Sequence, residues 1–304
     1  MRNSSGKLAM YVTLFIWGTT FVTSKMVLQN MAPLQLTFIR FLIGFLLLAP
    51  FAARQGFRLR QVFEWKYLLF GLTGTTLYYA LQNVGMTFTS VSSTSLILAS
   101  VPALTTLLAV IFLKERLERR QVLGIALVTI GVALISLNDF LRPGSASGSN
   151  PRLGNLLILC SALAWAVYTI QGRRMNDVPA LVATAAGMGA GALLLIPFMG
   201  WEIAARGLTL DVGWMTWLGV LYLSVAASGL TSFLWNYTLH YFSASEASAY
   251  INLVPIIAVA TGIFYGERPP LVQILGGALA IAGVLLSSAP RGASKKVAGI
   301  LIKN

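Results

Sequence analysis

Two stretches of this chain repeat each other. Residues 80–136 read ALQNVGMTFTSVSSTSLILASVPALTTLLAVIFLKERLERRQVLGIALVTIGVALIS, and residues 234–287 read LWNYTLHYFSASEASAYINLVPIIAVATGIFYGERPPLVQILGGALAIAGVLLS. The matching positions stand 153 residues apart at first and then 152 apart, and they include Leu81 and Leu234, Asn83 and Asn236, Ser90 and Ser243, Pro102 and Pro255, Gly124 and Gly276, and Gly131 and Gly283. The chain therefore contains two copies of one structural unit.

The composition indicates that the solvent around this unit is a lipid bilayer. Of the 304 residues, 57% are hydrophobic and only 10% are charged, whereas a soluble domain carries about 25% charged residues. In a bilayer the backbone must satisfy its own hydrogen bonds, as helices or as a closed barrel. The apolar runs here are about 17–25 residues long without alternation, which is the length of a membrane-spanning helix rather than a barrel strand.

We predict an all-α membrane protein with ten transmembrane helices. The predicted spans are 8–28, 34–53, 66–83, 92–113, 121–138, 153–172, 180–200, 213–237, 244–265 and 271–289. The predicted division is a five-helix repeat at 1–138, a Gly- and Ser-rich linker at 139–152, a second repeat at 153–289 and a tail at 290–304. Because five is odd, the second repeat enters the membrane from the opposite side. Inverted repeats of this kind are typical of secondary transporters, whose two halves open a central site to either face.

The positive charges predict the orientation. Sixteen of the 22 Lys and Arg residues fall in the connections that share a side with the N-terminus, whereas Lys25, Arg142, Arg152, Arg206 and Arg268 fall on the other side. Cytoplasmic loops are enriched in Lys and Arg. We therefore expect both termini in the cytoplasm, in a bacterial inner (plasma) membrane.

The sequence lacks the residues that several classes of function require. The net charge of +13 sits in short clusters between apolar segments, which is typical of topology signals and anionic lipid contacts rather than nucleic-acid binding. One His and one Cys cannot build an ordinary zinc site. A phosphate-binding Gly motif and a nucleophile-base pair are absent, so we expect no cofactor, no metal and no enzyme; a membrane-embedded enzyme would need clustered His, Asp, Glu or Cys.

The two stretches resemble the two EamA repeats of the drug/metabolite transporter superfamily. The shared features are a proline in the fourth helix of each repeat, the endings LKER and YGER, and a Gln-x-x-Gly helix with a second Gly seven residues on. The first ending departs from the second, which is the usual form. Within the superfamily the chain resembles bacterial exporters of amino acids, including aromatic ones. The resemblance implies export of amino acids or similar small metabolites; nucleotide-sugar and drug carriers of the superfamily are the alternative.

The fourth and ninth helices carry small polar residues on the face of their prolines. A proline leaves the carbonyl four residues earlier without a donor, and in a bilayer that carbonyl needs another partner. Ser95 and Pro102 share one face, as do Ser248, Asn252 and Pro255. This pattern predicts either a bendable polar seam beside a central cavity or a simple kink packed against a neighbour.

Side-chain amides mark the third and eighth helices. Tyr79, Gln82 and Asn83 are spaced i, i+3, i+4, and Trp235 and Asn236 lie at the matching places. Amides that face lipid are costly, so these face the bundle interior or water. They either contact an amino group or carboxylate of the substrate or form hydrogen bonds between helices.

Aromatic residues and one arginine complete the predicted site. Trp17, Trp165 and Tyr168 stack on a planar substrate or serve ordinary packing. Arg40 is the one basic residue well inside a span; it either extends its side chain to the outer surface or attracts a substrate carboxylate. The predicted substrate-binding residues are Trp17, Tyr79, Gln82, Asn83, Ser95, Trp165, Tyr168, Trp235, Asn236, Ser248 and Asn252, with Pro102 and Pro255 as hinges and Arg40 as the carboxylate contact.

Coupling to a proton is a further expectation that the sequence leaves open. Glu246 follows Ser243 by three residues, as in a helix-capping box, and His240 titrates near neutral pH but lies in a short loop. The partners that we expect are a small-molecule substrate and the lipid bilayer, with no nucleic acid, and the protein is expected to be a monomer.

Overall fold

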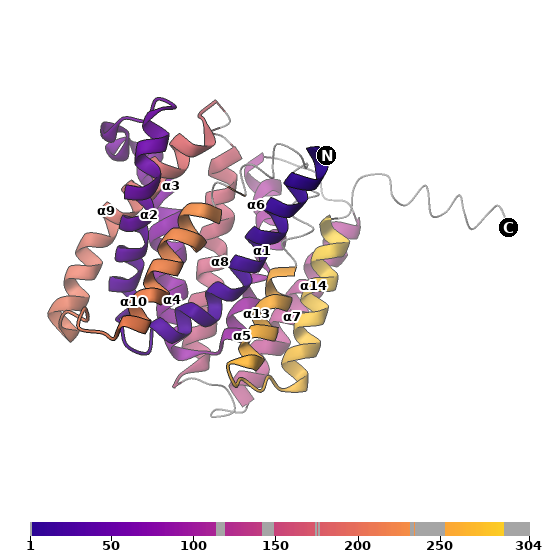
Figure 1. The fold of residues 1–304 in the computed structure, drawn as a ribbon. Coiled ribbons are helices and arrows are strands. Elements are labelled where there is room, and N and C mark those ends of the chain that lie inside the picture. The colour runs from indigo at the N-terminus through magenta and orange to yellow at the C-terminus, as the bar shows by residue number, and fades with distance from the viewer. Residues whose placement is uncertain are drawn as a thin grey trace.

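The computed structural model is a bundle of helices that lie side by side (Figure 1). It describes residues 2–113, 119–141, 149–173, 175, 177–231, 234 and 253–288. The described residues form helices and no strand, as predicted. The helices are α1 (Arg2–Val27), α2 (Pro33–Ala53), η1 (Leu59–Phe63), α3 (Trp65–Gly71), η2 (Leu72–Leu77), α4 (Tyr78–Phe88), α5 (Val91–Leu98), α6 (Val101–Leu113), α7 (Arg119–Leu141), α8 (Pro151–Arg173), α9 (Ala180–Arg206), α10 (Trp214–Leu221), η3 (Tyr222–Leu230), α13 (Leu253–Phe264) and α14 (Leu271–Ser288).

These helices group into the ten predicted spans. In the first half the spans are α1, α2, α3–η2–α4, α5–α6 and α7, and in the second half they are α8, α9, α10–η3, α13 and α14. Within the described residues, Pro33–Ala53, Pro151–Gly172 and Ala180–Arg206 are each long and apolar enough to cross a membrane alone. The third predicted span was too short, because its helices continue to Phe88.

Contacts between α7 and α14 show how the two halves are related. A Cβ atom placed on Gly131 would lie 2.4 Å from the carbonyl oxygen of Gly276, and one on Gly283 would lie 2.5 Å from that of Gly124. Adding the offset of 152 to Gly131 gives Gly283, and subtracting it from Gly276 gives Gly124. The second contact is therefore the first one with the two halves exchanged. The two halves are therefore related by a pseudo-two-fold axis, as inverted repeats require, and the glycines let the two helix backbones touch.

The fourth span departs from the continuous helix that the sequence analysis expected. It is divided at Ala99 and Ser100, and Pro102 is the second residue of the new helix α6. Proline suits the first turn of a helix, where its missing N–H has no partner to lose. Ser95 and Pro102 therefore do not lie on one continuous helix.

The third and eighth spans contain a feature that was not expected. Residues Leu72–Leu77 and Tyr222–Leu230 form π-helical segments, and the first of them, moved by the offset of 153, falls inside the second. Such segments inside membrane helices often accompany functional sites. Each packs against the long helix of the other half, because η2 contacts α9 and η3 contacts α2.

Glu267, which is buried, and Lys25, which is partly buried, lie at the end of the bundle at which α1 ends and α2 begins, which is lowest in Figure 1; we call it the Lys25 end. Glu267 accepts hydrogen bonds from the backbone N–H groups of Val91 (2.6 Å) and Ser92 (2.9 Å) and from the Ser92 hydroxyl (2.6 Å) at the start of α5. Lys25 Nζ donates to the carbonyl oxygens of Met86 (2.5 Å) and Thr89 (2.6 Å) at the end of α4. Both charges thus sit where a helix dipole favours them.

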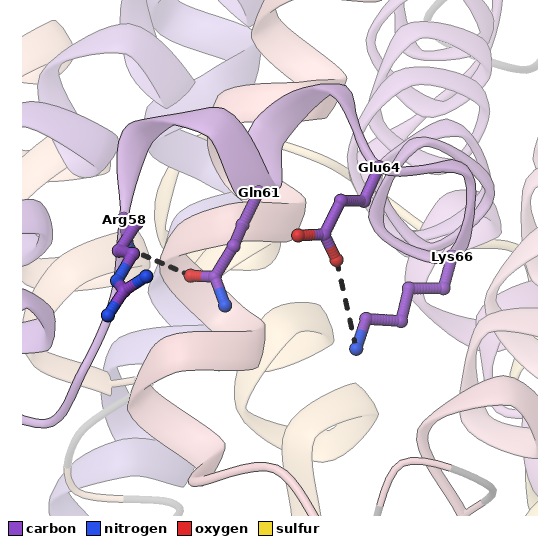
Figure 2. Close-up of polar contacts among 4 residues, drawn as sticks. All are labelled: Arg58, Gln61, Glu64 and Lys66. Atoms are coloured by element: carbon purple, nitrogen blue, oxygen red, sulfur yellow. Dashed lines mark hydrogen bonds and ion pairs between the residues drawn. The ribbon is translucent and has the colours of Figure 1, made fainter.

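The turn between α2 and α3 lies at the opposite end (Figure 1). Figure 2 shows its polar contacts: the N–H of Arg58 donates to Gln61 Oε1 at 2.8 Å, and Lys66 Nζ lies 3.9 Å from a carboxylate oxygen of Glu64. The side chains of Lys66 and Glu64 are 51% and 43% exposed.

Candidate functional site

Arg40 lies in the interior of the bundle, because only 2% of its surface is exposed. Its guanidinium carbon lies 4.6 Å from the ring centre of Tyr79 and 5.4 Å from that of Phe41. The guanidinium Nε donates a hydrogen bond to Ser228 Oγ at 2.9 Å. The side chain therefore does not extend to the membrane surface, and one of the two sequence interpretations is excluded.

The partner of Arg40 comes from the π-helical segment η3. The Ser228 hydroxyl donates to the carbonyl oxygen of Leu223, five residues earlier, at 3.0 Å, and its oxygen accepts from Arg40. No carboxylate forms an ion pair with Arg40 within the described part of the chain. A buried cation without an anionic partner is costly, so the site favours an incoming anion.

Six aromatic side chains extend from Arg40 across the bundle; we call Phe41, Phe70, Tyr78, Tyr79, Trp165 and Tyr168 the aromatic cluster. Adjacent ring centres lie 4.5 Å apart for Phe41 and Tyr79, for Tyr78 and Tyr79, and for Tyr78 and Trp165. The chain continues through Trp165 and Tyr168 at 5.0 Å to Tyr168 and Phe70 at 4.2 Å. It joins α2, α3, α4 and α8, so both halves contribute.

A glycine in the segment η2 allows one ring of the aromatic cluster to pack against the backbone. A Cβ atom on Gly74 would lie 2.2 Å from the ring of Tyr168, so only glycine lets that ring lie against the backbone. Tyr78 and Tyr79 follow directly at the start of α4 and contact different helices, α8 and α2.

Asn83 and Gln82 carry buried oxygens that lack hydrogen-bond donors. Asn83 is fully buried, and its Nδ2 donates to Thr37 Oγ1 at 2.8 Å. Among the described residues, Asn83 Oδ1 and Gln82 Oε1 are buried without a partner, as is Ser100 Oγ. Buried polar atoms are nearly always satisfied, so each such atom needs an explanation.

The structure places the predicted site residues in two groups. Arg40, Tyr79, Trp165 and Tyr168 are joined by direct contacts, and Asn83 is joined to α2 through Thr37. Trp17 donates from Nε1 to Thr231 Oγ1 at 3.1 Å. Ser95 is bonded within its own helix, to the carbonyl oxygen of Ser92 at 3.0 Å.

Most of the remaining predicted residues lie outside the part of the chain that the structure describes. Pro255 is a buried residue of α13. Trp235, Asn236, Ser248 and Asn252 lie outside the described residues, as do His240 and Glu246. Their roles stay predictions.

Sequence reasoning missed several members of the site. The doublet Tyr78-Tyr79 was a usable signal, because two large polar aromatics inside a span seldom both face lipid. Phe41 and Phe70 gave no signal beyond ordinary apolar spacing. Ser228 could not be found either, since its position depends on the π-helical turns of η3.

The residues of the site offer several kinds of binding group. The described residues hold no group of three His, Cys, Asp or Glu side chains that could bind a metal ion. A guanidinium, amide oxygens and aromatic faces instead supply a cation, hydrogen-bond acceptors and apolar surface. This combination suits reversible recognition of a small polar molecule.

Comparison with known proteins finds a matching family and several relatives. The sequence model of the EamA-like transporter family matches residues 4–137 and 152–289. The chain is 30% identical to an uncharacterized transporter of Archaeoglobus fulgidus over 94% of this chain and 98% of that protein. It is 26% identical, over 94% of each chain, to a protein of Streptantibioticus cattleyicolor named a probable terminal-alkyne amino-acid exporter.

A solved structure supports the fold. A crystal structure with 20% sequence identity superimposes with a TM-score of 0.65 and covers 94% of this chain and 97% of that chain. At this identity the likeness concerns the fold alone.

Proposed function

The chain belongs to the EamA-like transporter family, and we propose that it exports amino acids, aromatic ones among them, or similar small carboxylates by alternating access. We place it in a bacterial inner membrane with both termini in the cytoplasm. The inverted repeat supports alternating access, because two similar halves can exchange conformations around one central site. The relative named a probable amino-acid exporter supports the substrate class.

The observation that carries the proposal is the buried guanidinium of Arg40. It lies between the two halves, since it is on α2 and bonds to Ser228 of η3. Its positive charge meets no carboxylate in the described part of the chain. A substrate carboxylate would supply the missing anion, and the aromatic cluster beside it would contact the substrate side chain.

Counterflow in proteoliposomes tests this proposal. Purified protein is reconstituted into vesicles loaded with unlabelled L-phenylalanine, and uptake of labelled L-phenylalanine is followed with 3-phenylpropionate and an uncharged amide as competitors. A carrier for carboxylates accumulates label transiently, and the carboxylates compete while the amide does not. Absence of counterflow with a panel of amino acids and simple carboxylates would contradict the proposal.

The orientation has its own test. A fluorescent reporter that matures only in the cytoplasm is fused after Asn304, and we expect a bright fusion. A dark fusion that is well expressed and still transports would place the C-terminus outside.

A further inference from the structure

We infer that Asn83, together with Gln82, forms an ammonium subsite one helical turn from Arg40, so that the carrier selects zwitterionic α-amino acids over carboxylates without an amino group. This inference rests on the proposed function. It adds a second point of recognition to the one that Arg40 supplies.

The hydrogen bonds of Thr37 fix the orientation of the Asn83 amide. The Thr37 hydroxyl donates to the carbonyl oxygen of Pro33 at 2.7 Å, and a carbonyl can only accept. The single hydroxyl hydrogen of Thr37 is thereby used, so Thr37 Oγ1 can only accept from Asn83. Nδ2 of Asn83 must therefore face Thr37, and Oδ1 is the atom left over.

Asn83 Oδ1 therefore needs a donor. It is fully buried, and no donor within the described structure reaches it. A buried acceptor left unpaired costs about 1–3 kcal/mol. Gln82 Oε1, on the neighbouring residue, is buried at 4% exposure and also lacks a donor. A vacant acceptor of this kind suits a group with several N–H donors and no acceptor, which describes an ammonium group.

The subsite lies at the right distance from the carboxylate contact. Arg40 follows Thr37 by three residues on α2, and Asn83 follows Tyr79 by four on α4. Arg40 contacts Tyr79, and Asn83 bonds to Thr37, so the two pairs are stacked about one turn, or about 5.4 Å, apart. The carboxylate and ammonium groups of an α-amino acid are attached to the same carbon atom. Arg40 could therefore contact the carboxylate while Asn83, about one turn away, contacts the ammonium group.

Paired probes with and without the amino group test the inference. Counterflow is measured for L-phenylalanine and for 3-phenylpropionate in the wild type and in Asn83→Leu, which keeps the branched shape of the side chain and removes the acceptor. We expect the wild type to prefer L-phenylalanine and Asn83→Leu to lose about 10- to 100-fold of that preference, the value of a hydrogen bond to a charged group. Transport of 3-phenylpropionate should change little.

Two further variants keep the test decisive if Asn83→Leu folds poorly. Asn83→Asp retains the acceptor and adds a negative charge, so it should keep or increase the preference for L-phenylalanine. Thr87→Val is the matched control on α4, because the Thr87 hydroxyl bonds only within its helix, to the carbonyl oxygen of Val84 at 2.7 Å. It should leave the preference unchanged, and melting temperatures are recorded for all variants.

The outcomes separate the inference from the proposed function. If the wild type carries both probes equally well, the ammonium subsite is wrong and the carboxylate carrier stands. The same conclusion follows if Asn83→Leu lowers transport of both probes by one factor, because Asn83 then acts only on the fold. If the wild type carries neither these probes nor other amino acids, the proposed function fails and the inference fails with it.

Discussion

Glu267 at the Lys25 end and Arg40 are both buried charges, and Lys25 is partly buried, but their surroundings differ. Glu267 accepts three hydrogen bonds at the start of α5, and Lys25 donates to two carbonyl oxygens at the end of α4. Within the described residues, Arg40 has one hydrogen bond, through Nε, and two aromatic rings beside it. No donor from the same residues reaches the buried oxygens of Asn83 and Gln82.

The difference separates charges that hold the structure together from a charge that awaits a ligand. A fully paired buried charge gains its stabilisation in the empty protein, so removing it should affect folding. An incompletely paired one is costly until something binds, so removing it should affect binding. The following predictions test this division.

The largest expected effect is that of Arg40→Met on transport. Loss of a charged hydrogen bond to the substrate carboxylate costs about 2–3 kcal/mol, or about 30- to 100-fold in transport. Stability should be unchanged or higher, because the variant buries no charge and Ser228 keeps its bond to Leu223. Counterflow and thermal unfolding of the same purified sample measure both. A large fall in melting temperature would mean that Arg40 stabilises the fold, as Glu267 does.

Glu267→Ala is expected to lower stability and to leave transport nearly unchanged. It removes the acceptor for the N–H groups of Val91 and Ser92, and we expect a loss of about 2–4 kcal/mol in the free energy of unfolding. Transport per folded molecule should stay close to that of the wild type. Glu267→Gln keeps one acceptor oxygen and should lose less stability than the alanine variant; an equal loss would show that hydrogen bonding at α5 is not the cause.

Trp165→Leu should have a smaller effect, on selectivity. The ring of Trp165 lies 4.5 Å from that of Tyr78 and 5.0 Å from that of Tyr168. If it also contacts the substrate ring, its loss should lower the preference for L-phenylalanine over L-leucine by about fivefold, or about 1 kcal/mol. Trp201→Leu is the control, since Trp201 is 70% exposed on α9. An unchanged preference in Trp165→Leu would limit Trp165 to packing.

The sequence predicted the fold because its two strongest signals report on global architecture. Apolar runs of span length mark helices, and the offset between the two copies, seen in pairs such as Gly131 and Gly283, marks the inverted repeat. The ending YGER was recognised only as a family feature. In the structure Gly266 has a φ of +98°, a conformation that favours glycine, and it ends α13 so that Glu267 turns back to the start of α5.

The site was predicted less well because it depends on local geometry. Arg40, Tyr79 and Trp165 were found as polar or aromatic residues in apolar runs, but their contacts depend on the π-helical segments η2 and η3. A π turn changes which residues face inward, and no residue pattern in either segment announced it. The break at Ala99 was missed for a related reason, since Pro102 fits both a kinked helix and the first turn of a new one.

The smallest effect is expected for the exposed pair of Glu64 and Lys66 (Figure 2). In this pair an ammonium nitrogen lies 3.9 Å from a carboxylate oxygen. Both side chains are about half exposed, however, and water already solvates their charges. Exposed pairs are worth about 0.2–1 kcal/mol, so we expect a coupling energy of about 0.5 kcal/mol or less.

A double-mutant cycle with Glu64→Ala, Lys66→Ala and the double variant measures this coupling energy. The cycle is needed because Lys66 Nζ also lies 4.7 Å from the ring centre of Tyr67, and Lys66→Ala alone would lose that contact as well. Salt should reduce the coupling further, since screening acts on exposed charges. A coupling as large as the loss in Glu267→Ala would mean that burial and pairing at a helix end do not distinguish Glu267, and the division between the two kinds of buried charge would lose its physical basis.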